Sequence, residues 1–127
     1  MKIFYKILYL LLFSTLLFGQ DDSVNVQFLV LSSELKETEN VYIVGNQDFL
    51  GYWDPSKVKM TKINKEEYSI CFKLEKYSSI EYKFTLGSWD REALDENGEV
   101  PENFELIAEK DTVLVYNITN WAHEFVR

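Results

Sequence analysis

The chain of 127 residues contains one cysteine and one histidine, and this scarcity removes several kinds of chemistry. Cys71 has no partner in the chain, so no intramolecular disulfide can form. His123 lies four residues from the end, where an exposed tail residue is a simpler interpretation than a general base. The sequence also lacks a Gly-x-Ser-x-Gly elbow, a phosphate-binding glycine loop and any His or Cys cluster with metal-ligand spacing. We therefore expect no enzyme, no cofactor and no metal site.

The first residues, "MKIFYKILYLLLFSTLLFGQ", have the pattern of a secretory signal peptide. Two lysines precede an apolar core over residues 7–18, and small residues follow near the end of the segment. A membrane anchor is the alternative, but this core is well short of the roughly 20 apolar residues that a spanning helix needs. We expect a signal peptide over residues 1–20, cleavage after Gly19 or Gln20, and a secreted or periplasmic protein.

Basic residues are scarce in the remaining part, residues 21–127, whose length suits one domain. Two of the 13 basic residues leave with the signal peptide, and 11 against 21 acidic residues give a net charge of −10. Such a surface repels phosphate backbones and anionic lipid, because both carry the same sign of charge. We expect neither nucleic acid nor, after cleavage, a membrane as partner, whereas a neutral ligand is indifferent to this charge.

Apolar and polar residues alternate with the period of two that strands require. The segments are "VNVQFLVLS", "NVYIVGN", "YSICFKL", "SSIEYKFTL" and "DTVLVYNIT", and no helical spacing is sustained between them. In "SSIEYKFTL" the apolar residues fall on one face, and Glu81, Lys83 and Thr85 fall on the other. Six or seven short strands in about 100 residues predict an all-β fold, an immunoglobulin-like antiparallel β-sandwich of about seven strands.

Two features of this pattern allow a functional and a structural interpretation. Cys71 could be a reactive thiol, but no histidine or second cysteine lies near it in the sequence to lower its pKa, so a half-buried strand cysteine is favoured. The segment "DENGE", residues 95–99, has Asp95 and Asn97 alternating before Gly98, as in a calcium loop. It lacks the other ligands of such a loop, and Asn-Gly favours a hairpin turn.

Trp53 stands apart from the many aromatic residues that a small sandwich needs for its core. It follows Leu-Gly-Tyr and precedes Asp54-Pro55, a combination that favours an irregular loop at the surface edge. A flat ring held by such neighbours can stack on the C–H face of a sugar with little loss of side-chain entropy. The sugar hydroxyls then need polar partners such as Asp54, Asn46 or Lys83.

Three segments in order, "VYIVGN", "LGYWDP" and "IEYKF", resemble the starch-binding domain known as the family-20 carbohydrate-binding module. The resemblance extends over roughly residues 24–121 and also reaches the related glycogen-binding domains of kinase regulatory subunits. It implies an immunoglobulin-like sandwich whose principal site stacks a glucose unit of an α-1,4-glucan between two tryptophans, with a lysine beside them. Trp53 matches the first tryptophan, and Lys83 matches the lysine.

The second tryptophan of the resembled pattern falls in the segment "GSWDREALDENGEVPENFEL". Trp89 comes earlier than the family position, which lies near Ala93 and is not aromatic here. The resemblance makes Trp89 the candidate to replace that ring from a different backbone position. It makes Asn103, which precedes Phe104 where the family has an Asn-Arg step, a further hydroxyl partner.

Structural roles compete with these assignments. Trp53 could be a loop anchor packed on Tyr52 or Phe49, Lys83 could belong to a solvated strand face, and Trp89 could anchor a turn. We expect Trp121 to pack where the last strand leaves the sandwich.

The favoured function is a secreted, non-catalytic module that binds an α-glucan (starch, glycogen or maltooligosaccharide) or another neutral polysaccharide. The alternatives are a protein-interaction sandwich and an accessory domain of a secreted glycoside hydrolase or esterase.

Overall fold

The computed structural model describes residues 22–123, which form seven strands and two short 3-10 turns. The predicted signal peptide, residues 1–20, lies outside the described residues. The elements in chain order are β1 (Ser23–Leu31), β2 (Tyr42–Gly45), η1 (Asp48–Leu50), β3 (Thr61–Asn64), β4 (Glu67–Glu75), β5 (Ser79–Thr85), η2 (Trp89–Arg91), β6 (Phe104–Ile107) and β7 (Thr112–Asn117).

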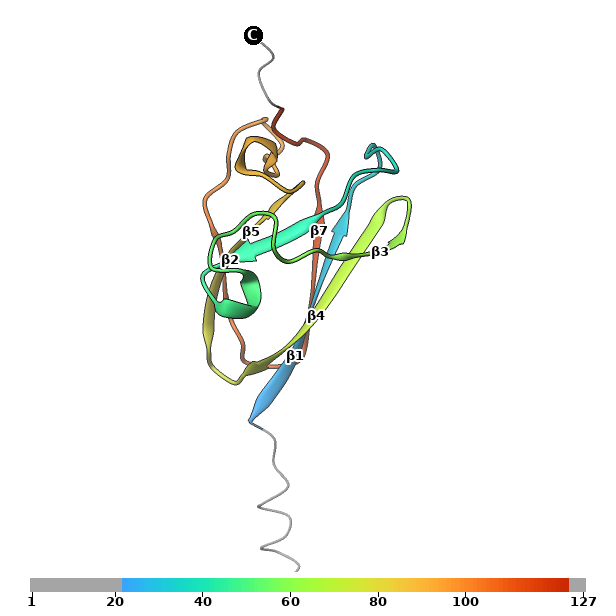
Figure 1. The fold of residues 1–127 in the computed structure, drawn as a ribbon. Coiled ribbons are helices and arrows are strands. Elements are labelled where there is room, and N and C mark those ends of the chain that lie inside the picture. The colour runs from blue at the N-terminus through green and yellow to red at the C-terminus, as the bar shows by residue number, and fades with distance from the viewer. Residues whose placement is uncertain (1–21, 124–127) are drawn as a thin grey trace, which may run out of the picture.

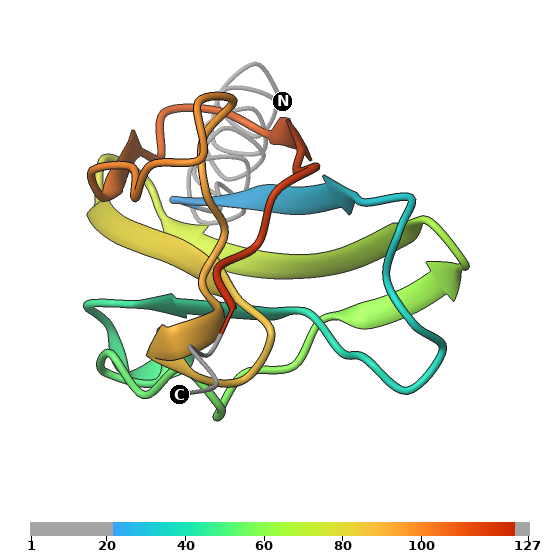
Figure 2. The same cartoon turned by 90° about the horizontal axis from the view of Figure 1, so that it is seen from above.

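The strands form two sheets that enclose one core, as Figures 1 and 2 show from two directions. One sheet has the order β3-β4-β1-β7 and the other the order β2-β5-β6. All pairs are antiparallel except β1 with β7, which run parallel. The predicted sandwich of about seven strands is confirmed, and the parallel pair is the one departure from the expected antiparallel pattern.

The core is built from the inward faces of both sheets. On β1 and β5 every second residue is buried, which excludes apolar area from water. Tyr82 of β5 lies at the centre of an aromatic group, with its ring 4.9 Å from Phe28 and 5.6 Å from Phe104. Its hydroxyl shares a hydrogen bond with the Tyr116 hydroxyl, and burial raises the pKa of both phenols. This pairing satisfies two polar groups that the core would otherwise isolate.

Four local predictions can be compared with this arrangement. Cys71 lies on β4 as expected, but it is exposed, so the prediction of a half-buried thiol is wrong. The residue is on the outer face of a sheet that nothing in the described chain covers. The turn at residues 95–99 forms, with the Asp95 carboxylate accepting from the amides of Asn97 and Glu99. Trp121 is 7% exposed, as expected for a packing residue, and His123 is exposed.

Gly45, at the end of β2, is required by close approach of the chain. A Cβ atom there would meet the Glu81 carbonyl oxygen and lie 2.7 Å from Leu50 Cδ1. Only a hydrogen fits between these groups, so the loop after β2 can turn closely over the sheet.

We predict that Gly45→Ala lowers the free energy of unfolding by about 3 kcal/mol, because the added methyl group overpacks a backbone contact that cannot relax. The control is Gly98→Ala, where the backbone φ of 76° is strained for alanine but nothing lies within 4 Å. That variant should lose about 1 kcal/mol. Urea unfolding measures both, and an equal or smaller loss for Gly45→Ala would contradict the packing argument.

Candidate functional site

The Trp53 loop has an unusual backbone. Gly51, Tyr52 and Trp53 have φ angles of 80°, 46° and 64°, so three successive residues are left-handed. This conformation costs a residue with a side chain about 1–2 kcal/mol. It is held by hydrogen bonds from Trp53 N to the Gly45 oxygen, 2.9 Å, and from Asp54 N to the Gly51 oxygen, 3.0 Å. The loop therefore fixes the direction of Trp53 at the cost of local strain.

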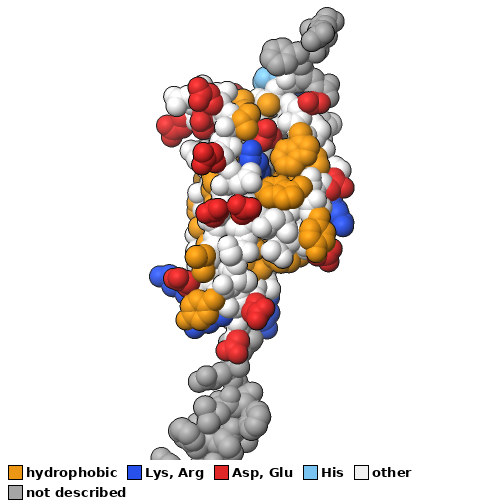
Figure 3. Space-filling model, turned by 90° about the vertical axis from the view of Figure 1, so that its left-hand side faces the viewer, with side chains coloured by type: hydrophobic (Ala, Val, Ile, Leu, Met, Phe, Trp, Pro, Cys, Tyr) orange, Lys and Arg blue, Asp and Glu red, His pale blue; other side chains and the backbone are white. Residues whose placement is uncertain are grey.

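The Trp53 ring lies beside the Trp89 ring at the surface. Their centroids are 6.4 Å apart and their planes are inclined by 40°. Trp89 is 40% exposed, so it is not a core residue. The alternative partners of Trp53 are turned elsewhere: Phe49 packs on Phe72 with centroids 5.1 Å apart, and Tyr52 is 66% exposed. Figure 3 shows hydrophobic side chains gathered on one face of the molecule, with acidic groups around them.

Thr85 ties together the two loops that carry these rings. It is the last residue of β5 and lies on the outer face of the sheet, yet it is fully buried. Its hydroxyl donates to the Pro55 carbonyl oxygen at 2.7 Å and accepts from Gly87 N at 3.1 Å. One side chain thus connects the segment after Trp53 to the segment before Trp89, which restricts movement of one ring relative to the other.

A second tie holds the far end of the Trp89 segment. Arg91 donates through both terminal nitrogens to the Glu39 carboxylate, at 2.9 and 2.7 Å. Such a two-pronged pair fixes geometry as well as charge, and the hydrogen bonds to Arg91 lower the pKa of Glu39.

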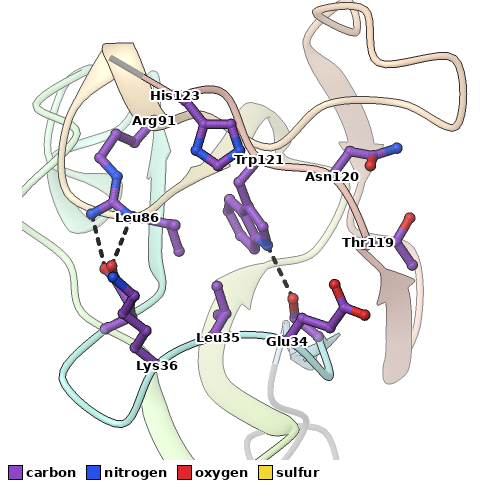
Figure 4. A pocket seen from close by; sticks show the side chains of 11 residues that line it. Glu34, Leu35, Lys36, Leu86, Arg91, Thr119, Asn120, Trp121 and His123 are labelled. Atoms are coloured by element: carbon purple, nitrogen blue, oxygen red, sulfur yellow. Dashed lines mark hydrogen bonds and ion pairs between the residues drawn. The ribbon is translucent and has the colours of Figure 1, made fainter. Parts of the chain in front are cut away.

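This pair forms one wall of a hollow of about 360 Å³ behind the Trp89 turn, drawn in Figure 4. Trp121 lines this hollow, and its indole nitrogen donates a hydrogen bond to Ser32 Oγ at 3.0 Å. His123 lies at its edge. Arg91 therefore connects the Trp89 segment to the packed end of the sandwich.

Lys83 lies on the same outer face of β5, two residues before Thr85. Its ammonium is 3.2 Å from Glu92 Oε2, and the two side chains are only 13% and 14% exposed. Lys83 is thus not part of a solvated strand face. Glu92 is held in turn by a β-bridge to Thr85 and by a hydrogen bond from Ala122 N to its carbonyl oxygen, 2.9 Å.

The other expected hydroxyl partners differ in their contacts. Asp54 Oδ1 accepts from Ser56 N and Ser56 Oγ, and these bonds lower the pKa of Asp54 and shape the loop. Asn46 Oδ1 accepts a hydrogen bond from Glu81 N, and Asn46 N donates to the Glu81 carbonyl oxygen. The side-chain oxygen of Asn46 is therefore engaged by the backbone of β5. Asn103 is exposed and directly precedes β6, whose first residue, Phe104, pairs with Tyr82 of β5. Asp54 and Asn46 therefore have structural contacts within the protein, whereas Asn103 is exposed at the start of β6.

The ring geometry limits how a flat ligand can bind. A ring inserted between two aromatic faces needs a contact of about 3.5–4.0 Å on each side, hence a separation of about 7–8 Å. The observed 6.4 Å is too short for such a slot. Trp53 and Trp89 instead offer two ring faces inclined to each other, a shape that suits successive rings of a curved oligomeric ligand. Within residues 22–123 there is no group of acidic, His and Cys residues that could hold a metal ion, and no helix suited to cross a membrane.

Two adjoining tryptophans at the surface of an immunoglobulin-like sandwich are typical of the carbohydrate-binding class of proteins. Residues 23–114 match the family described as the starch binding domain, and the chain belongs to this family. The solved family 20 module of the maltotetraose-forming amylase from Pseudomonas saccharophila shares the fold over 99% of its length and 74% of this chain, with a TM-score of 0.54 and 20% identity.

The other relatives are larger proteins. An amylopullulanase of Thermoanaerobacterium thermosulfurigenes is 50% identical over 46 residues, 36% of this chain and 2% of that enzyme. An amylopullulanase of Thermoanaerobacter thermohydrosulfuricus is 34% identical over 80 residues, 63% of this chain and 5% of that enzyme. The glucoamylase of Hypocrea jecorina shares the fold with a TM-score of 0.59 and 19% identity, over 80% of this chain and 18% of its own. The chain thus spans a small part of each of these three.

The sequence did not single out Glu92, Arg91 or Glu39. Each acts through a partner distant in sequence or in an irregular segment, and no spacing pattern marks such pairs. Thr85 was assigned to the outer face with Lys83, but its burial depends on the Pro55 loop folding over it. The outer face of this strand otherwise carries the charged residues Glu81 and Lys83. The uncharged Thr85 at its end is the one sequence signal that could have indicated that a loop covers this position.

We predict that Thr85→Val loosens the two tryptophan loops. The substitution keeps the shape but leaves the Pro55 oxygen and the Gly87 amide without their partner, at a cost of about 1–3 kcal/mol in unfolding free energy. The near-ultraviolet circular dichroism of the coupled Trp53 and Trp89 rings should also weaken. Thr61→Val, at an exposed position of β3, is the control, and an unaltered aromatic signal in Thr85→Val would contradict the proposed tie.

We predict an acid-sensitive contribution from Glu39. Because its pKa in the folded protein is lowered from 4.5, the ion pair stabilises the fold above about pH 4.5, and this contribution is lost as the pH falls through the lowered value. Glu39→Gln should therefore flatten the decline of stability below pH 4.5. Thermal unfolding of both proteins between pH 3 and 7 measures this, and parallel profiles would show that the pair adds nothing.

Proposed function

We propose that this protein is a secreted, non-catalytic module that binds α-glucans such as starch, glycogen or maltooligosaccharides. The observation that carries the proposal is the Trp53 and Trp89 pair, held at the surface 6.4 Å apart. Each ring can cover the C–H face of a glucose unit, and burial of these apolar surfaces supplies the attraction. An α-linked chain is curved, and a bent aromatic surface suits it better than it suits a straight β-linked chain.

Lys83 and Asn103 are the proposed partners of the sugar hydroxyls. Lys83 donates to Glu92 and has further ammonium hydrogens to donate, while Asn103 is exposed just before β6, the strand that pairs with β5. Asp54 has a smaller part in this proposal, because its carboxylate oxygen already accepts a hydrogen bond from Ser56 N within the Trp53 loop.

The names of the relatives support both the proposed ligand and the proposed partner enzyme. Their names describe an amylopullulanase, a glycoside hydrolase family 15 glucoamylase and a maltotetraose-forming amylase. We propose that this module likewise acts beside a glycoside hydrolase, bringing the enzyme to an insoluble glucan. The acidic surface, with a net charge of −8 for the whole chain, is compatible with a neutral polysaccharide.

We predict that titration with maltoheptaose produces a saturable change in tryptophan fluorescence and that cellohexaose does not. Trp53→Ala should weaken maltoheptaose binding at least about tenfold, because one lost stack of about 1.4 kcal/mol corresponds to that factor. Tyr77→Ala is the matched control, since Tyr77 is also a left-handed, 69% exposed aromatic residue, placed at the β4–β5 turn. It should bind as the unaltered protein does.

Two outcomes would overturn the proposal. The unaltered protein could fail to respond to either sugar, which would direct the search to protein partners of the same sandwich. Trp53→Ala could bind maltoheptaose as tightly as Tyr77→Ala does, which would place the site elsewhere. Urea unfolding of both variants checks that each remains folded.

A further inference from the structure

Lys83 lies on β5 two residues before Thr85, and its partner Glu92 directly follows the turn that carries Trp89. Lys83 is the basic residue on the outer face of β5, and a lysine in that position would by itself attract anionic ligands. Glu92 lies 3.2 Å away, and both side chains are largely excluded from water. Partial burial reduces screening, so each charge strongly alters the potential that the other presents.

The backbone of Glu92 is fixed on both sides, so the carboxylate is held in place. A β-bridge joins Glu92 to Thr85, and the amide of Ala122 donates to the Glu92 carbonyl oxygen at 2.9 Å. The next residue, Ala93, donates to Phe84 O, also at 2.9 Å. Lys83 is fixed by its place in β5, opposite Val44 of β2. The ion pair is thus built from two rigid segments.

We propose that Glu92 is a specificity-determining residue of this site: by neutralising Lys83 it restricts the site to neutral glucans and excludes polysaccharides that carry carboxylates. The inference rests on the proposed function, because it concerns the same tryptophan site. Lys83 keeps its hydrogen-bond donors for hydroxyl groups, but the pair has no net charge. A carboxylate at C6 of a glucose unit would meet the fixed negative charge of Glu92 along with the cation.

The test compares maltoheptaose with its C6-oxidised form, in which the primary hydroxyls are carboxylates. Glu92→Gln keeps the size and an acceptor oxygen but removes the charge that balances Lys83. We expect it to raise the affinity for the oxidised sugar about tenfold relative to the affinity for maltoheptaose. A single nearby charge of opposite sign shifts the pKa of a carboxylate by about one unit or more, which corresponds to the same factor. The gain should shrink at 1 M salt, where the screening length is about 3 Å.

Two variants make the result specific. Glu96→Gln removes one negative charge from the exposed turn at residues 95–99 and should leave the ratio of affinities unchanged. The double variant Lys83→Gln with Glu92→Gln removes both charges of the pair and should bind the oxidised sugar no better than the unaltered protein does. Calorimetric or fluorescence titration measures all of these.

The outcomes separate this inference from the proposed function. An unchanged ratio in Glu92→Gln, or an equal rise in Glu96→Gln, would overturn the role of Glu92 while maltoheptaose binding stands. A rise in the double variant as large as in Glu92→Gln would also overturn it, because Lys83 would then not be the source of attraction. Failure of the unaltered protein to bind maltoheptaose would overturn the proposed function itself.

Discussion

The alternation of side chains along β5 (Ser79–Thr85) is the constraint on which the rest of the structure depends. Its inward residues include Tyr82, which joins aromatic side chains of both sheets at the centre of the core. Its outward residues include Lys83 and Thr85, which hold Glu92 and the Pro55 loop. A shift of one residue would exchange the two faces and place a lysine in the core. Packing of the core therefore fixes the register of the site.

The sequence was sufficient for the fold because five strands alternate clearly and glycine-rich or polar turns separate them. It did not locate β3 (Thr61–Asn64) or β6 (Phe104–Ile107), which have four residues each. The first is exposed throughout, so its sequence has no apolar face to mark it. Both form because a longer neighbour, β4 or β5, supplies hydrogen-bonding partners. Strand formation by such short segments is decided by tertiary pairing and not by local pattern.

The site could be predicted only in part, for a related reason. Trp53 is marked by its glycine and proline neighbours, and Lys83 by its place on a polar strand face. The partner of Lys83 comes from an irregular segment, where no period relates sequence to direction. Arg91, which ends the turn that carries Trp89, is likewise paired with a residue 52 positions away, Glu39. Such contacts follow from the closed fold and leave no trace in local spacing.

Rigidity explains why strain is concentrated in the Trp53 loop. A stacked sugar gains only a modest apolar contact, so an aromatic ring that had to be ordered on binding would lose much of the benefit. Left-handed residues at Tyr52 and Trp53 raise the energy of the folded chain before any ligand arrives. Hydrogen bonds to Gly45 and through Thr85 offset that cost within the fold. Thr85 extends this restraint to the Trp89 segment, because its one hydroxyl contacts both the Pro55 carbonyl oxygen and the Gly87 amide.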